Sequence, residues 1–172
     1  MIEQTIKDQP QRDRALDETA SFIVQAPAGS GKTELLTLRY LKLLSKCSTP
    51  ESVLAITFTR KAAAEMRNRV IKMLRWGRQL KNLSKSEDRQ GIQNPVDTRL
   101  HKTQLSIVTE ALKTNEKHNW DLDRNPFRLK IQTIDSFCAS LARQLPIASQ
   151  LGGQPNITSE VDHCFHDAIM QT

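Results

Sequence analysis

Apolar residues gather in three short runs, and each run predicts a β-strand. Phe22–Ala26 and Val53–Phe58 are almost continuous apolar runs, whereas Leu129–Ile134 alternates apolar with polar positions. A continuous run is typical of a parallel strand buried on both faces, and alternation is a second strand pattern. We therefore expect three strands, with Val53–Phe58 covered on both sides.

Between these runs, apolar positions recur with the period of an α-helix. Thr59 is a candidate N-cap for the helix after the second run, and Asp135 for the helix after the third. Strand, loop and helix follow one another in this order twice, which predicts an α/β fold with a parallel sheet and flanking helices. The expected helices are Gln11–Thr19, Lys32–Ser45, Arg60–Gln79, Arg99–Lys117 and Asp135–Leu145.

Two parts of the chain lie outside this alternation. Residues 77–126 are polar, lack strong strand signals and contain Asn-Pro pairs at 94–95 and 125–126, so we interpret them as a helical insertion. A last helix is expected after Ser159, and residues 155–172 would then begin a further helical subdomain.

The loop after the first apolar run has the residues of a phosphate-binding loop. It reads Ala26-Pro27-Ala28-Gly29-Ser30-Gly31-Lys32-Thr33 and leads directly into a leucine-rich helix. Glycines let backbone N–H groups approach an anion, and the following helix directs its positive dipole end at the same point. Lys32 would contact the β- and γ-phosphates, and the Thr33 hydroxyl would bind Mg²⁺. Ala26 replaces the first glycine of the usual pattern.

Charge and composition narrow the classes of partner. The 172 residues carry a net charge of +6, and between Arg60 and Arg89 ten basic residues face three acidic ones. This basic strip beside a nucleotide site fits a polyanion, although a solvated helix face explains the charge equally well. No run spans a bilayer, no apolar leader precedes the first helix, and three scattered cysteines fit reduced thiols, so we expect a cytoplasmic protein without a membrane partner. The four histidines form no zinc pattern.

Three motifs in series resemble the UvrD/Rep helicases of superfamily 1A. The loop resembles their motif I, Val53–Val70 resembles motif Ia nearly residue for residue, and Thr133-Ile134-Asp135-Ser136-Phe137 resembles the next motif. Asp135 stands where that motif usually has His, as in the AddA and RecB helicase–nucleases. The resemblance covers most of residues 9–150 and implies a P-loop NTPase (RecA-like) domain over residues 1–172, incomplete and with the insertion at 77–126.

The resemblance also implies roles for single residues. Gln11 would recognise adenine, although Gln9 is an equally plausible candidate on composition. Phe58 would stack on a base, with a core position as the alternative, and for Phe137 the core position is favoured. The implied nucleotide-binding residues are Gln11, Ala26, Pro27, Ala28, Gly29, Ser30, Gly31, Lys32 and Thr33, with ATP and Mg²⁺ as cofactors. The implied contacts to single-stranded DNA are Thr57, Phe58, Thr59, Arg60 and Ser136.

The sequence also departs from the family. It has no apolar strand followed by the acidic Walker B pair and none of the later helicase motifs, so we expect a fragment that binds ATP and DNA but hydrolyses ATP slowly. The expected function is the N-terminal portion of a 3′–5′ DNA helicase in recombination or repair, which would act with remaining helicase domains or partner subunits. A small stand-alone P-loop phosphotransferase and a non-catalytic DNA-binding remnant remain alternatives. A partial sheet also predicts marginal stability or self-association.

Overall fold

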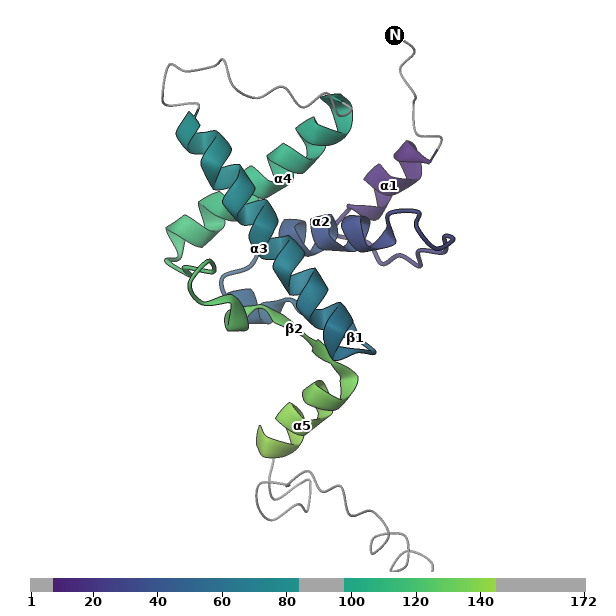
Figure 1. The fold of residues 1–172 in the computed structure, drawn as a ribbon, viewed down its shortest axis with the longest axis vertical. Helices are drawn as coiled ribbons and strands as arrows, with labels where there is room; N and C mark the ends of the chain where they lie inside the picture. The colour runs from purple at the N-terminus through teal and green to yellow at the C-terminus, as the bar shows by residue number, and fades with distance from the viewer. Residues whose placement is uncertain (1–7, 84–97, 145–172) are drawn as a thin grey trace, which may run out of the picture. The chain divides into compact units, whose positions relative to one another are not determined.

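The computed structural model describes residues 8–83 and 98–144 and has an α/β fold in these ranges. The chain divides into two compact units, Met1–Thr133 and Ile134–Thr172, and each is described by itself. The described elements of the first unit are α1 (Gln9–Ala15), α2 (Lys32–Leu44), η1 (Pro50–Ser52), β1 (Leu54–Thr57), α3 (Arg60–Leu83), α4 (Thr98–Lys117), η2 (Pro126–Arg128) and β2 (Lys130–Thr133) (Figure 1). The second unit contributes α5 (Ile134–Gln144).

The helices predicted from apolar spacing are present, with shifted ends. α2 and α4 match the expected ranges within one residue, α1 is shorter than expected, and α3 continues to Leu83. Thr59 caps α3 as predicted, because its Oγ1 accepts a hydrogen bond from the backbone N–H of Ala62 at 3.1 Å. The prediction that Asp135 caps α5 is wrong. This helix already begins at Ile134, so the Asp135 carboxylate lies in its first turn, where the helix dipole still favours it.

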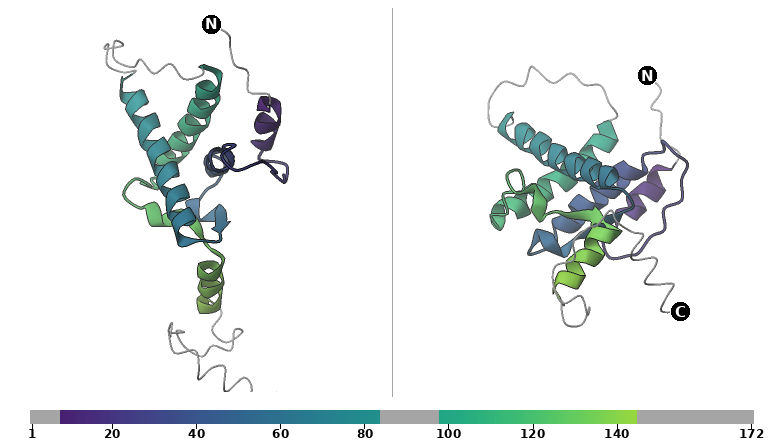
Figure 2. Two further views of the ribbon diagram at one scale, coloured as in Figure 1. Left: turned by 45° about the vertical axis from the view of Figure 1, so that its right-hand side comes forward. Right: turned by 60° about the horizontal axis from the view of Figure 1, so that its bottom comes forward.

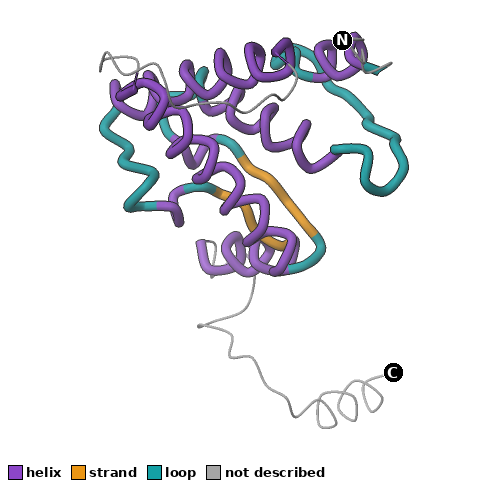
Figure 3. Tube along the Cα trace, turned by 45° about the horizontal axis from the view of Figure 1, so that its top comes forward, coloured by secondary structure: helices purple, strands orange, loops and turns teal. Residues whose placement is uncertain are grey.

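The sheet consists of two parallel strands in the described part of the chain. β1 pairs with β2 in a register that aligns Ala55 with Ile131 and Thr57 with Thr133 (Figure 3). These four side chains share the face that packs toward the helices, and Ile131 is fully buried. The other face carries Leu54 and Ile56, which are 42% and 47% exposed. The expectation that the second apolar run is buried on both faces is therefore wrong, because only one face is covered.

The predicted first strand does not form. Residues 21–27 carry no regular secondary structure and run as an extended segment before the glycine loop. A strand needs the backbone groups of a neighbouring strand, and no described strand pairs with this segment. The side chain of Ile23 is 99% exposed, so the apolar character of the run reflects no burial here.

The core of the first unit lies where α2, α3 and α4 pack together and continues to β2 (Figure 1). Figure 2 (left) views α2 nearly along its axis, with α1 and the pair α3–α4 on opposite sides of it. The most deeply buried large side chains are Leu41, Leu44, Val70, Leu74, Val108, Leu122, Leu129 and Ile131. At Gly77 the backbone of α3 comes so close to α4 that a Cβ would stand 2.4 Å from Val108 Cγ1.

The predicted insertion coincides with part of this core. α4 lies within residues 77–126, and its Ile107, Val108, Ala111 and Leu112 are all buried. Whether 77–126 is an insertion on a larger scaffold stays a prediction. The helix expected after Ser159, and the subdomain expected from residue 155, lie outside the described residues. Among the helices that are described, none combines the length and apolar character needed to cross a bilayer.

Candidate nucleotide-binding site and DNA-facing turn

The glycine loop ends in a backbone conformation that favours anion binding. Gly29 and Gly31 have φ angles of +76° and +83°, the left-handed region that glycine adopts without steric cost. Gly31 is the N-cap residue of α2, and no side chain caps the helix. The first N–H groups of α2 therefore have no intrahelical acceptor and remain available to a ligand at the positive end of the helix dipole.

The Lys32 ammonium group lies inside the loop and stiffens it. Its Nζ donates hydrogen bonds to the carbonyl oxygens of Ala26 and Pro27, the latter at 2.6 Å. An ammonium group has three N–H donors, so one remains after these two bonds. Lys32 can thus fold the loop around itself and still contact a phosphate oxygen.

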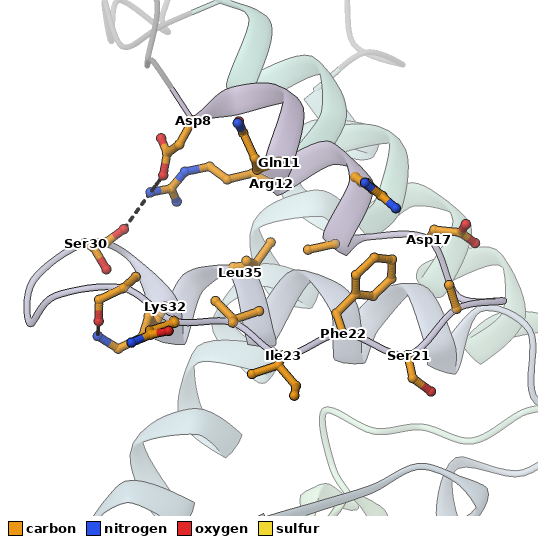
Figure 4. A pocket seen from close by; sticks show the side chains of 16 residues that line it. Asp8, Gln11, Arg12, Asp17, Ser21, Phe22, Ile23, Ser30, Lys32 and Leu35 are labelled. Carbon is orange, nitrogen blue, oxygen red and sulfur yellow. Dashed lines mark hydrogen bonds and ion pairs between the residues drawn. The ribbon is translucent and has the colours of Figure 1, made fainter.

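A second cation, from α1, supports the same loop from outside. Arg12 Nη2 donates to the carbonyl oxygen of Ser30 at 2.6 Å and lies 3.0 Å from Asp8 Oδ2 (Figure 4). The hydrogen bond from Arg12 lowers the pKa of the Asp8 carboxyl below its ordinary value of 3.8. The pair stays charged near neutral pH, so Arg12 ties α1 to the end of the glycine loop.

Two pockets meet at this loop. The larger, of about 620 Å³, is lined by α1, the extended segment and the loop, and includes Gln11 and Lys32 together (Figure 4). The smaller, of about 240 Å³, contains Gln9 and Gly31. Gln9 also donates to Asp13 Oδ1 at 2.8 Å. The larger pocket therefore brings together the two residues expected at opposite ends of a nucleotide, and its glutamine is Gln11.

The residues present fit a triphosphate and its metal ion. The Ser30 hydroxyl is buried without a hydrogen-bond partner, which is an unfavourable state that an anion in the loop would relieve. Thr33, in the first turn of α2, is exposed and can reach a metal ion held by the phosphates. Among the described residues no cluster of His, Cys, Asp and Glu is arranged to hold a metal by itself. The phosphates would then have to supply most of the ligands.

The turn between β1 and α3 presents the predicted DNA contacts to solvent. Phe58 is 93% exposed, which contradicts its alternative assignment to the core. Thr57 Oγ1 donates to the carbonyl oxygen of Thr59 at 3.0 Å and holds the turn closed, while Arg60 begins α3 and is exposed. In Figure 1 this turn and the glycine loop both lie toward the right of the first unit. The arrangement can offer hydroxyls, one aromatic ring and one cation to a nucleic acid.

The basic strip on α3 is divided between two environments. Lys61, Lys72 and Arg75 are exposed, and their spacing of 11 and 14 residues places them on one side of the helix. Arg67 points the other way, and its Nη2 donates to the carbonyl oxygen of Ile131 on β2. The helix therefore uses one arginine to hold the sheet and leaves a row of three cations free to meet solvent.

The remaining predicted residues belong to the second unit. Ser136 and Asp135 are exposed on α5 and Phe137 is half-buried, so the assignment of Phe137 to a core and its alternative place along a DNA path both stay predictions. Ser136 as a DNA contact stays a prediction as well. Sequence reasoning missed Arg12, although its position directly after Gln11 on a short helix was a usable signal.

Comparison with known proteins agrees with this arrangement. Residues 7–169 match the family model of the UvrD/REP helicase N-terminal domain. The chain is 48% identical over 61 residues to DNA helicase II of Salmonella typhimurium, covering 35% of this chain and 8% of that protein. It is 31% identical over 137 residues to an ATP-dependent helicase/nuclease subunit from Latilactobacillus sakei subsp. sakei, covering 73% and 14%. For the protein of the same name from Clostridium novyi the values are 32% over 132 residues, 74% and 10%.

The chain thus spans 8% to 14% of the length of these relatives. No solved structure is significantly similar to it.

Proposed function

Because the chain belongs to the UvrD/REP helicase N-terminal domain family, we propose that it is the ATP-binding N-terminal portion of an ATP-dependent DNA helicase that acts on single-stranded DNA. The observation that carries this proposal is the pocket that contains both Gln11 and Lys32 beside a glycine loop in anion-binding geometry. A nucleotide in this pocket would meet an amide at one end and an ammonium group at the other.

In this proposal the loop holds the triphosphate of ATP and Thr33 contributes to the Mg²⁺ site. Backbone N–H groups of the loop and of the first turn of α2 would bind the phosphate oxygens, with the remaining proton of Lys32. Bound Mg²⁺ would neutralise charge on the phosphates. Gln11 would bind the adenine edge through its amide, which both donates and accepts hydrogen bonds.

Single-stranded DNA would bind at the turn that follows β1. The exposure of Phe58 supports a stacking role, since every base offers a flat face to an aromatic ring. The exposed row of cations on α3 would continue the contact with phosphates. The full proposed set is Thr57, Phe58, Thr59, Arg60 and, from the second unit, Ser136.

The wider setting follows from the family. We propose a RecA-like arrangement over residues 1–172, to which further helicase domains or partner proteins contribute the missing catalytic groups. Translocation in the 3′–5′ direction, a role in recombination or repair, and a cytoplasmic location belong to the same proposal. The 172 residues contain no apolar strand followed by an acidic pair, so this chain by itself should bind ATP and hydrolyse it slowly.

The test compares ATP binding and turnover by the unaltered chain and by Lys32→Ala, with and without single-stranded DNA. Lys32→Ala should weaken ATP binding at least about tenfold, because it removes a charge-assisted contact with the phosphates. Lys46→Ala is the matched control, since Lys46 is an exposed lysine near the other end of α2 whose nearest acidic partner is Glu18 at 3.9 Å.

Fast turnover that single-stranded DNA leaves unchanged would contradict the proposal. A phosphorylated small-molecule product that disappears with Lys32→Ala would replace it with a phosphotransferase.

A further inference from the structure

Arg39 of α2 makes four contacts, and all four are with residues that line the larger pocket. Its Nη1 donates to the carbonyl oxygens of Ala15 at 2.6 Å and Asp17 at 2.8 Å, and its Nη2 donates to that of Ala20 at 2.7 Å. Its Cζ lies 5.2 Å from the ring centroid of Phe22. Arg39 itself does not line the pocket, although each of its partners does. It therefore acts on the pocket from behind the wall.

The wall that Arg39 holds is the one that carries no regular structure. The segment from Ala20 to Pro27 has no strand partner, so its shape depends on contacts with side chains. α2 holds this segment at both ends, through Arg39 at Ala20 and through Lys32 at Ala26 and Pro27. Seven residues are close to two helical turns, so these two cations project from the same face of α2.

The chemistry of a guanidinium group suits this position. Ala15 is the last residue of α1, where carbonyl oxygens lack intrahelical partners and the helix dipole is negative. A planar guanidinium group can donate to several such carbonyls at once and still lie over the Phe22 ring. A lysine ammonium group has neither the planar fork nor the stacking face, so Arg39→Lys should lose most of the geometry while it keeps the charge.

We infer that Arg39 is a positioning residue for the base of the bound nucleotide. It fixes the end of α1, the helix that carries Gln11, and the segment that carries Phe22, so it sets the shape of the pocket away from the phosphates. The glycine loop depends instead on Lys32 and Arg12. This inference rests on the proposed function, because it assumes that the pocket binds a nucleotide.

A second contact between α2 and the same segment provides a matched control. Lys42 Nζ lies 3.2 Å from Glu18 Oε2, and neither residue lines the larger pocket. Lys42→Gln therefore removes a comparable tie to the segment, one residue from the partner Asp17, without touching the pocket wall. A merely structural effect of loosening the segment should appear equally in Lys42→Gln and Arg39→Lys.

The experiment measures the Kd of ATP and of inorganic tripolyphosphate, both with Mg²⁺, for the unaltered chain, Arg39→Lys and Lys42→Gln. Arg39→Lys should weaken ATP binding about tenfold, the size of one charge-assisted hydrogen bond, and change tripolyphosphate binding less than about twofold. It should also reduce the preference for ATP over GTP. Lys42→Gln should leave all three values unchanged. Phe22→Leu, which removes the ring under the guanidinium group and keeps the hydrogen bonds, should give a smaller loss for ATP alone.

A second readout needs no ligand. Hydrogen exchange of the backbone amides at residues 17–22 should be faster in Arg39→Lys than in the unaltered chain. Equal loss of ATP and tripolyphosphate, or the same loss in Lys42→Gln, would overturn the inference. An unaltered chain that binds neither ligand would instead overturn the proposed function and the base assignment with it, and exchange would then decide whether Arg39 holds the segment at all.

Discussion

Gly77 on α3 faces Val108 on α4 at a point where only glycine fits. A Cβ at Gly77 would stand 2.4 Å from Val108 Cγ1 and 3.0 Å from Leu112 Cδ1. Val108 is fully buried and Leu112 is 2% exposed, so neither side chain can turn away into solvent. The close approach of the two helices depends on the missing side chain.

Gly77→Ala should therefore destabilise the first unit. Alanine would favour the helix by about 1 kcal/mol, but overpacking a filled core costs roughly 1–3 kcal/mol and should outweigh it. Urea denaturation followed by circular dichroism measures the difference. The double variant Gly77→Ala/Val108→Ala should recover part of the loss, and a Gly77→Ala protein more stable than the original would show that the helices can separate without cost.

Phe58→Ala should weaken binding to single-stranded DNA without changing stability. Stacking of one base on an aromatic ring contributes about 1–3 kcal/mol, and an exposed side chain contributes little to folding. Fluorescence anisotropy with a labelled oligonucleotide measures the affinity. Phe127→Ala is the matched control, because Phe127 is 71% exposed and lies away from the turn in sequence. Equal effects of the two variants would argue against the DNA-facing turn.

The exposed cations on α3 should set the salt dependence of DNA binding. For single-stranded DNA the slope of log K against log salt is about −0.7 for each phosphate neutralised. Removing Lys72 and Arg75 together should therefore reduce the slope by about 1.4 and weaken binding to all sequences alike. Lys113→Ala, which removes an exposed cation from α4, should leave the slope unchanged. A slope that none of these changes affects would place the polyanion elsewhere.

Stability should fall in acid, partly through the pair formed by Glu51 and Arg128. Arg128 Nε lies 2.7 Å from Glu51 Oε1, and this hydrogen bond lowers the pKa of Glu51 below its ordinary value of 4.5. A carboxyl whose pKa is lower in the folded state stabilises the fold above its unfolded pKa and loses that contribution as pH falls through its folded pKa.

Tm should consequently decrease between about pH 5 and about pH 3. Glu51→Gln should be less stable at neutral pH and show a shallower decrease, and Arg128→Gln should do the same because it removes the same pair. The pKa values of Asp8, Asp17 and Glu18 are lowered as well, so a residual decrease should remain in both variants. A Tm that does not depend on pH over this range would contradict the assignment.

The helices and the loop could be predicted because their signals are local. Leucine spacing defined α2, Thr59 marked the start of α3, and the Gly-Ser-Gly-Lys-Thr order needed no distant partner. The Phe22–Ala26 strand failed for the opposite reason. An apolar, β-prone run becomes a strand only when another strand supplies hydrogen bonds, and the sequence of the run does not contain that information.

The supporting arginines were missed because an arginine on a helix is usually solvated. Arg12 reaches a residue 18 positions away, and Arg39 reaches residues 19 to 24 positions away. Contacts of this range follow from how α1 folds back on α2. Phe58 shows the same limit in reverse, since its apolar character suggested burial and its position at the end of a strand left it in solvent.

The interval between Lys32 and Arg39 has a consequence for comparing chains by their letters alone. One residue added to or deleted from α2 between them would rotate the later side chain by about 100° and turn it off the wall. Any homologue that keeps both anchors should therefore conserve the count of six intervening residues more strictly than their identities, and a gap in an alignment at that point would signal a pocket built differently.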